Sequence, residues 1–174
     1  MTGTRTLVAG VGNIFQRDDA FGVEVIRLLD GTPLPPGVRV KDFGIGGVHL
    51  VYELLDGCDL FVLVDAAQRG CEPGTVTVLE VEPEHMPSAE TVLDAHGLAP
   101  DQVFAMLASL GSRPGRTLVV ACEPADVSPG MGLSDSVRQA LPAAVRAVQE
   151  ILDEVRREDQ IQQKRGADND VHAD

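Results

Sequence analysis

Aromatic and basic side chains are scarce in this chain of 174 residues. It has no tryptophan, one tyrosine and five phenylalanines, so it offers few platforms on which unpaired bases stack. Only 14 Lys and Arg residues stand against 27 Asp and Glu residues, which gives a formal net charge of −13. This charge repels phosphate backbones, which proteins bind through Lys and Arg. We therefore expect no nucleic acid partner.

Long apolar runs and a cysteine framework are also missing. The longest apolar runs, such as residues 60–64, are far shorter than the roughly 20 residues that cross a bilayer, so we expect no membrane partner. Three cysteines stand at irregular spacing, at Cys58, Cys71 and Cys122, and no signal peptide precedes them. This pattern favours a reduced, cytoplasmic protein.

Two familiar hydrolase motifs do not occur. The chain has neither the Gly-x-Ser-x-Gly elbow of serine hydrolases nor the His-Glu-x-x-His helix of zinc peptidases. Neither of these mechanisms has support from the sequence.

What the chain does contain is the alternating pattern of an α/β domain. Strands are predicted at 6–9, 38–40, 59–64, 75–79 and 117–121, and helices after Asp18, at 48–55, at 100–110 and from Ser134 to near Arg157. Residues 82–95 are predicted to form a loop. The result is a three-layer αβα fold with a five-stranded, twisted, mostly parallel sheet. The connection before residues 75–79 is too short for a helical crossover, so this strand should run antiparallel to 59–64.

We place one domain at residues 1–157. The 44% hydrophobic content of the chain is enough for one core of ordinary size. Residues 158–174 hold five acids and two bases with little to bury, and we expect this tail to be disordered.

Carboxylates are predicted to gather at one edge of the sheet. Gly10 and Gly12 allow a sharp turn after the first strand, and an acidic pair, Asp18 and Asp19, follows at the mouth of a helix. Asp19, Asp42 and Asp65 each follow the carboxyl end of a strand, where ligands collect in open α/β sheets. We expect the three to face one crevice.

A histidine in a later loop completes a set of metal ligands. Two carboxylates and the imidazole of His96 bind a first-row divalent metal and leave positions open for substrate or water. Structural roles remain open for each residue: Asp18 caps a helix, Asp19 complements the helix dipole, Asp42 bonds to backbone N–H groups in a turn, and His96 packs in its loop. Asp65 follows a strong buried strand, and such a carboxylate is usually partnered or used.

The order of these motifs resembles the hydrogenase maturation endopeptidases. The shared elements are Gly10-x-Gly12-Asn13, Asp18-Asp19-x-x-Gly22, Asp42 with Gly46-Gly47, Val64-Asp65-Ala66, His96-Gly97 and Gly132-Leu133-Ser134, collinear from about residue 5 to 152. The resemblance implies a phosphorylase/hydrolase-like sheet. It also implies an endopeptidase that removes the C-terminal extension of a nickel-loaded [NiFe] hydrogenase large-subunit precursor.

The same resemblance assigns roles to individual residues. It places the metal on Asp19, Asp65 and His96, and it includes Asp42 as a feature without a fixed role. We assign catalysis to Asp42, as a base or as the group that orients a ligand, and substrate binding to Asn13. The metal is nickel, which the substrate itself can supply, and zinc or cadmium can substitute for it. Well-known members carry Glu where this chain has Asp19. Gly22 fixes the offset that favours Asp19 over Asp18 as the ligand.

Other protein classes remain as alternatives. Gly10-x-Gly12 also suits a dinucleotide-binding module, although Phe15 stands where the third glycine belongs. A peptidyl-tRNA hydrolase-like esterase opens with a similar turn but needs a basic face and an early histidine, and this chain has none before His49. A non-catalytic metal-binding module or scaffold is the third alternative.

Overall fold

The computed structural model describes residues 3–86 and 100–170, which form an α/β domain. In chain order its elements are β1 (Thr6–Val11), η1 (Arg17–Ala20), α1 (Phe21–Leu29), β2 (Val38–Gly44), α2 (Gly47–Leu55), β3 (Leu60–Ala66), β4 (Val76–Val81), η2 (Pro83–His85), α3 (Pro100–Ser109), β5 (Arg116–Cys122) and α4 (Asp135–Asp170). Every predicted strand and helix within these residues is present.

Within the described residues, the sheet has five strands in the order β2-β1-β3-β5-β4. The pairs β1–β2, β1–β3 and β3–β5 are parallel, and the pair β4–β5 is antiparallel. The mostly parallel sheet with one antiparallel strand is therefore confirmed. The direction predicted for β4 is also right, but β4 pairs with β5, because β5 lies between β4 and β3.

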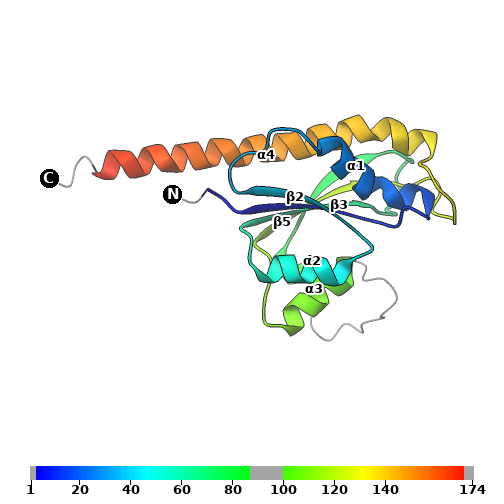
Figure 1. Ribbon diagram of the computed structural model, residues 1–174, viewed down its shortest axis with the longest axis horizontal. Helices are drawn as coiled ribbons and strands as arrows, with labels where there is room; N and C mark the ends of the chain where they lie inside the picture. Colours follow the sequence, from blue (N-terminus) through cyan, green and yellow to red (C-terminus); the bar gives the residue numbers. More distant parts are fainter. Residues whose placement is uncertain (1–2, 87–99, 171–174) are drawn as a thin grey trace.

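Helices cover both faces of the sheet, as Figure 1 shows. Helices α1 and α4 lie on one face, over a core cluster that includes Phe21 and Val62. Helices α2 and α3 lie on the other, over a second cluster that includes Phe61 and Leu107. The central strand β3 contributes to both clusters, which explains why its sequence is a continuous apolar run.

The C-terminal segment differs from its prediction. Helix α4 does not end near Arg157 but continues to Asp170, so residues 158–170, predicted to be disordered, form its last turns and extend beyond the sheet (Figure 1). The segment lacks an apolar stripe, but its Glu, Gln, Lys and Arg residues are good helix formers. Asp159 also accepts a hydrogen bond from the backbone N–H of Thr4 at 3.1 Å, which ties the helix to the start of the chain.

Within residues 3–86 and 100–170, no helix is both long and apolar enough to span a membrane.

Three glycines let β1, its loop and α1 approach closely at the carboxyl edge of the sheet. A Cβ at Gly22 would overlap the carbonyl oxygens of Val64 and Val11, and one at Gly12 would overlap the carbonyl of Asp19. A Cβ at Gly10 would meet the backbone of Gly22. The helix that follows the acidic pair therefore packs directly on the ends of β1 and β3.

We predict that Gly22→Ala lowers the free energy of unfolding by about 2–4 kcal/mol, because backbone carbonyls cannot move aside as side chains do. Urea unfolding measures this loss. Gly166→Ala is the matched control, because its Cβ meets open space in a helix, and it should leave stability unchanged or slightly raised. Equal effects of the two substitutions would contradict the close approach.

Candidate active site

Asp19 and Asp65 form a pair of carboxylates at the carboxyl edge of the sheet. Asp19 lies in η1 and Asp65 near the end of β3, and both side chains are half-buried. Burial, with the charge of Asp19 adding to it, raises the pKa of Asp65 to about 8. Asp65 therefore keeps its proton near neutral pH.

The turn after β1 fixes the position of Asp19. The backbone N–H of Asn13 donates to Oδ2 of Asp19 at 2.8 Å. The side chain of Asn13 in turn accepts a hydrogen bond from the backbone N–H of Phe15 at 2.9 Å, which closes an Asx turn. Asn13, predicted to bind substrate, thus lies beside the carboxylate pair and shapes the loop around it.

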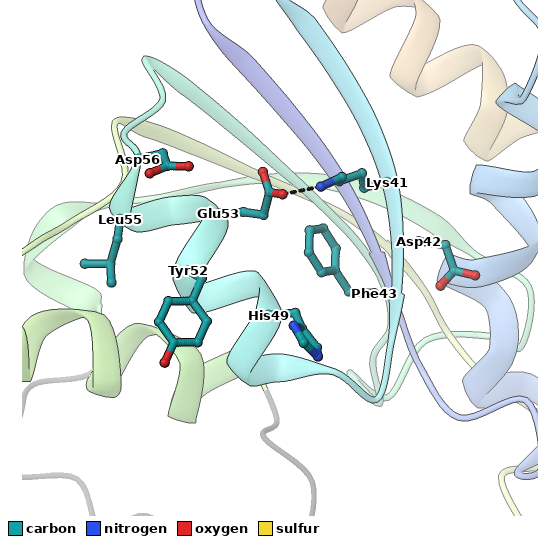
Figure 2. A pocket seen from close by; sticks show the side chains of 8 residues that line it. All are labelled: Lys41, Asp42, Phe43, His49, Tyr52, Glu53, Leu55 and Asp56. Atoms are coloured by element: carbon teal, nitrogen blue, oxygen red, sulfur yellow. Dashed lines mark hydrogen bonds and ion pairs between the residues drawn. The ribbon is translucent and has the colours of Figure 1, made fainter.

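Asp42 lies apart from this pair. It belongs to β2, opposite Gly10 of β1, so β1 separates it from β3. Its Oδ1 accepts a hydrogen bond from the backbone N–H of Gly44 at 2.8 Å, and its side chain is exposed. In Figure 2 it points toward α1 and away from His49. The turn hydrogen bond considered for Asp42 is therefore present.

His96 lies outside the described residues, so its position relative to Asp19 and Asp65 stays a prediction. Among residues 3–86 and 100–170, no group of three His, Cys, Asp or Glu side chains is arranged to hold a metal ion. The described part of the proposed ligand set is the Asp19–Asp65 pair. Carboxylate oxygens are ligands for divalent cations, and the charge of a cation would offset the repulsion between these two groups.

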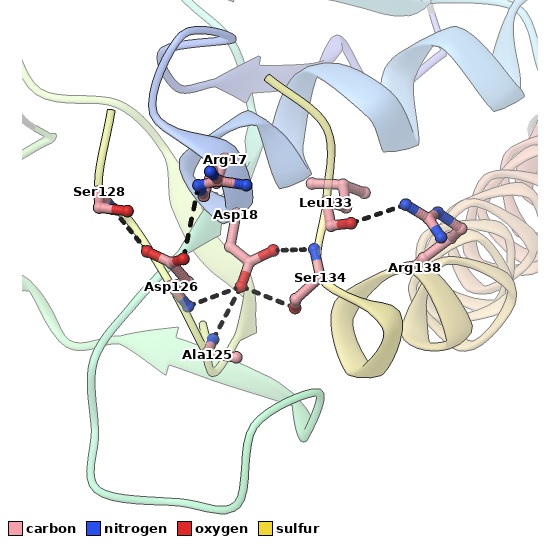
Figure 3. A network of polar contacts seen from close by, with 8 residues as sticks. All are labelled: Arg17, Asp18, Ala125, Asp126, Ser128, Leu133, Ser134 and Arg138. Atoms are coloured by element: carbon pink, nitrogen blue, oxygen red, sulfur yellow. Dashed lines mark hydrogen bonds and ion pairs between the residues drawn. The ribbon is translucent and has the colours of Figure 1, made fainter. Parts of the chain in front are cut away.

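Asp18, the other member of the acidic pair, has a different role. It is fully buried and makes no helix-cap hydrogen bond, so the predicted cap is wrong. Its carboxylate accepts hydrogen bonds from the backbone N–H groups of Ala125, Asp126 and Ser134 at 2.7–2.9 Å, and from the Ser134 hydroxyl at 2.8 Å (Figure 3). Burial opposes ionisation, but these hydrogen bonds outweigh it and lower the pKa of Asp18.

The loop between β5 and α4 makes further contacts with η1, the segment that contains Asp18 and Asp19. Arg17 has a φ of 47° and its N–H donates to the carbonyl of Gly130 at 3.0 Å. A Cβ at Gly130 would overlap the guanidinium of Arg17, which pairs with Asp126 at 3.4 Å (Figure 3). Sequence reasoning missed this contact, because Arg17 and Gly130 are ordinary loop residues until the chain folds.

Glu123 is a second supporting carboxylate that sequence reasoning missed. It follows β5 directly and is 9% exposed. Its oxygens accept hydrogen bonds from the backbone N–H groups of Arg69 at 2.7 Å and Gly70 at 3.3 Å, so it holds the loop after Asp65. The signal was available, because Glu123 follows a buried strand just as Asp65 comes at the end of another.

The cysteines do not supply a nucleophile to this site. Burial, together with the charges of Asp18 and Glu123, raises the pKa of the Cys122 thiol to about 11. Burial also raises the pKa of Cys58. Both thiols therefore stay protonated at neutral pH, and Cys71 is exposed in the loop after β3.

The fold and the site together define an α/β protein with a carboxylate pair suited to a cation. A family model, HycI, described as hydrogenase maturation protease, matches residues 23–154. The chain is 31% identical over 158 residues to the hydrogenase expression/formation protein HoxM of Azotobacter vinelandii, across 88% of this chain and 75% of that protein. It is 29% identical over 146 residues to the hydrogenase 2 maturation protease of Escherichia coli, across 83% and 88%.

The solved structures agree with these relatives. The hydrogenase maturating endopeptidase HybD from E. coli superimposes with a TM-score of 0.70 at 28% identity, covering 86% of this chain and 93% of that one. The chain belongs to the hydrogenase maturation protease family. It is a hydrolase, an endopeptidase of hydrogenase maturation, and the resemblance seen in its motifs is confirmed.

We predict that Asp65→Asn stabilises the metal-free protein at pH 8 but not at pH 4. The unfolded chain releases the Asp65 proton near its ordinary pKa of 3.8, whereas the folded chain keeps it up to about pH 8. Stability therefore falls as the pH rises between these values. The substitution removes this loss of stability, which is worth roughly 2–5 kcal/mol. Chemical unfolding with a chelator present measures the difference. Asp153→Asn, on the exposed face of α4, should show no such dependence on pH.

Substitutions in the acidic pair should have opposite effects on folding. Asp18→Asn brings an NH2 group against backbone N–H donors and should cost about 2–4 kcal/mol. Asp19→Asn removes a charge that repels Asp65 and should leave the protein as stable or more so at pH 8. Thermal unfolding of both variants checks this, and equal losses would show that the two roles are not distinct.

Proposed function

We propose that this endopeptidase removes the C-terminal extension from the nickel-loaded precursor of a [NiFe] hydrogenase large subunit. Nickel seated in the precursor is contacted by Asp19, Asp65 and His96. The observation that carries the proposal is the position of Asp19 and Asp65, two half-buried carboxylates at the carboxyl edge of the sheet, where ligands bind in this type of fold.

In this scheme nickel is part of the substrate, and the chain supplies an incomplete set of ligands. A loaded precursor brings the cation that the pair lacks, and Asp65 then gives up its proton. A nickel-free precursor offers no such cation and loses the main contact. Discrimination between the two follows from the difference in binding.

The chain's own residues position the reacting groups. Asn13 and the Asp18 network hold Asp19, and Glu123 holds the loop after Asp65. When bound, the metal polarises the scissile carbonyl or lowers the pKa of a water, roles that contribute several kcal/mol. Asp42, exposed on β2 opposite Gly10 of β1, is assigned as the base or as the group that orients a ligand. The reaction belongs in the cytoplasm under this proposal.

Incubation of the purified protein with nickel-loaded and nickel-free precursor tests the recognition step. We expect cleavage of the loaded form only, followed by the mass of the released extension. No cleavage of the loaded form, or equal cleavage of both, would contradict the proposal.

His96→Ala should abolish processing and shift the thermal midpoint little, because a loop histidine adds little to the core. His85→Ala is the matched control: His85 is exposed in η2, and this variant should process normally. Loss of folding in His96→Ala, or normal processing, would argue against His96 as a ligand.

A further inference from the structure

The outer edge of β2 is open within the described part of the chain. In this part of the chain β2 is an edge strand of the sheet and pairs with β1. The N–H of Thr6 donates to the carbonyl of Gly37 at 3.0 Å, so the parallel ladder directs the backbone groups of Arg39 and Lys41 toward β1. Those of the alternate residues Val40 and Asp42 point outward. An edge of this kind accepts an added strand.

Hollows flank this edge on both faces of the sheet. On the α1 side a hollow of about 410 Å3 is lined by Ile26, Leu34 and Val40 among others. On the α2 side a hollow of about 730 Å3 is lined by residues that include Phe43 and Tyr52 (Figure 2). Side chains of an added strand alternate between faces, so both hollows would be filled.

A third hollow lies between the end of β2 and the loop after β1, which contains Asn13. It measures about 280 Å3, and its lining includes Asn13, Phe15 and Ile45, of which Phe15 and Ile45 are 61% and 68% exposed. Asn13 also holds Asp19. Asp42 borders all three hollows, which therefore meet at the end of β2.

The distance from this edge to the site suits an extended chain. A strand added outside β2 lies three strand positions from β3, about 14 Å, which an extended chain spans in about four or five residues. If the scissile peptide bond lies at Asp19 and Asp65, the extension therefore reaches the outer edge of β2 within about five residues.

We propose that the C-terminal extension of the precursor binds as an added strand, antiparallel to β2. This inference rests on the proposed function. The nickel-bearing body then lies at the carboxylate pair, and the extension runs away from it along Asp42 and Val40. The enzyme then recognises the extension through main-chain hydrogen bonds and through its length. Aliphatic side chains of the extension are favoured where they face Leu34 and Val40. The added strand spans the length of β2, which is seven residues.

Proline scanning of the two sheet edges tests this binding mode on nickel-loaded precursor. Val40→Pro removes an outward N–H that the β1 ladder does not use, a position where strands tolerate proline. We expect kcat/KM to fall at least about tenfold, mainly through KM, because main-chain hydrogen bonds are lost. Cadmium affinity should stay unchanged. Val40→Ala, which keeps the N–H, controls for the lost side chain.

Val78→Pro is the matched control on the opposite edge, in β4. Val78 is 45% exposed, and the hydrogen bond from the N–H of Glu123 to the carbonyl of Thr75 indicates that the Val78 N–H also points outward. This variant should process within about twofold of the wild type. Equal losses of kcat/KM in Val40→Pro and Val78→Pro would overturn the proposal. If Val40→Pro changed only the self-association of the protein, the proposal would also be overturned, because the β2 edge would then be a contact between copies of this chain.

Truncation of the extension gives a second test with the unaltered enzyme. Shortening it to about three residues should slow cleavage at least about tenfold, whereas an unrelated proline-free extension of about ten residues should be cleaved normally. Undiminished cleavage of the short form would contradict strand addition. Absence of cleavage with the full-length extension would instead reject the proposed function.

Discussion

The burial of Asp65 near the charge of Asp19 is the constraint on which the rest of the site depends. Asp65 lies near the end of β3, and the backbone N–H of Asn13 holds Asp19 in η1. Burial, with the charge of Asp19 adding to it, raises the pKa of Asp65 to about 8. Ionisation of Asp65 therefore costs stability, and under the proposed function a cation brought by the substrate offsets this cost.

Much of the surrounding structure serves to keep these two side chains in place. Asp18 and Glu123 are buried carboxylates that accept hydrogen bonds from backbone N–H groups, so they anchor loops. Glycines at the strand–helix junction remove the side chains that would separate α1 from β3. The two adjacent acids therefore have different roles: Asp18 stabilises the fold, whereas Asp19 lies near Asp65 and is proposed as a ligand.

Periodicity in the sequence was sufficient to predict the layers and the strand directions, because apolar runs and glycine turns act locally. It also placed Asp19 and Asp65 at the carboxyl edge of the sheet, whereas Asp42, expected in the same crevice, lies on β2 with β1 between it and β3. It was not sufficient for contacts that form only when distant loops meet. The partners of Asp18 lie more than a hundred residues away, at Ala125 and Ser134, so a helix cap was the nearest explanation. The last turns of α4 were missed because helix propensity, rather than burial, maintains them. The position of His96 stays a prediction.

The most direct test is a crystal structure of the protein soaked with nickel or cadmium, with the metal located by anomalous scattering. We predict one main peak within about 2.0–2.4 Å of an oxygen from both Asp19 and Asp65, and of a nitrogen of His96. A metal bound elsewhere, or a carboxylate pair without metal at saturating concentration, would contradict the account.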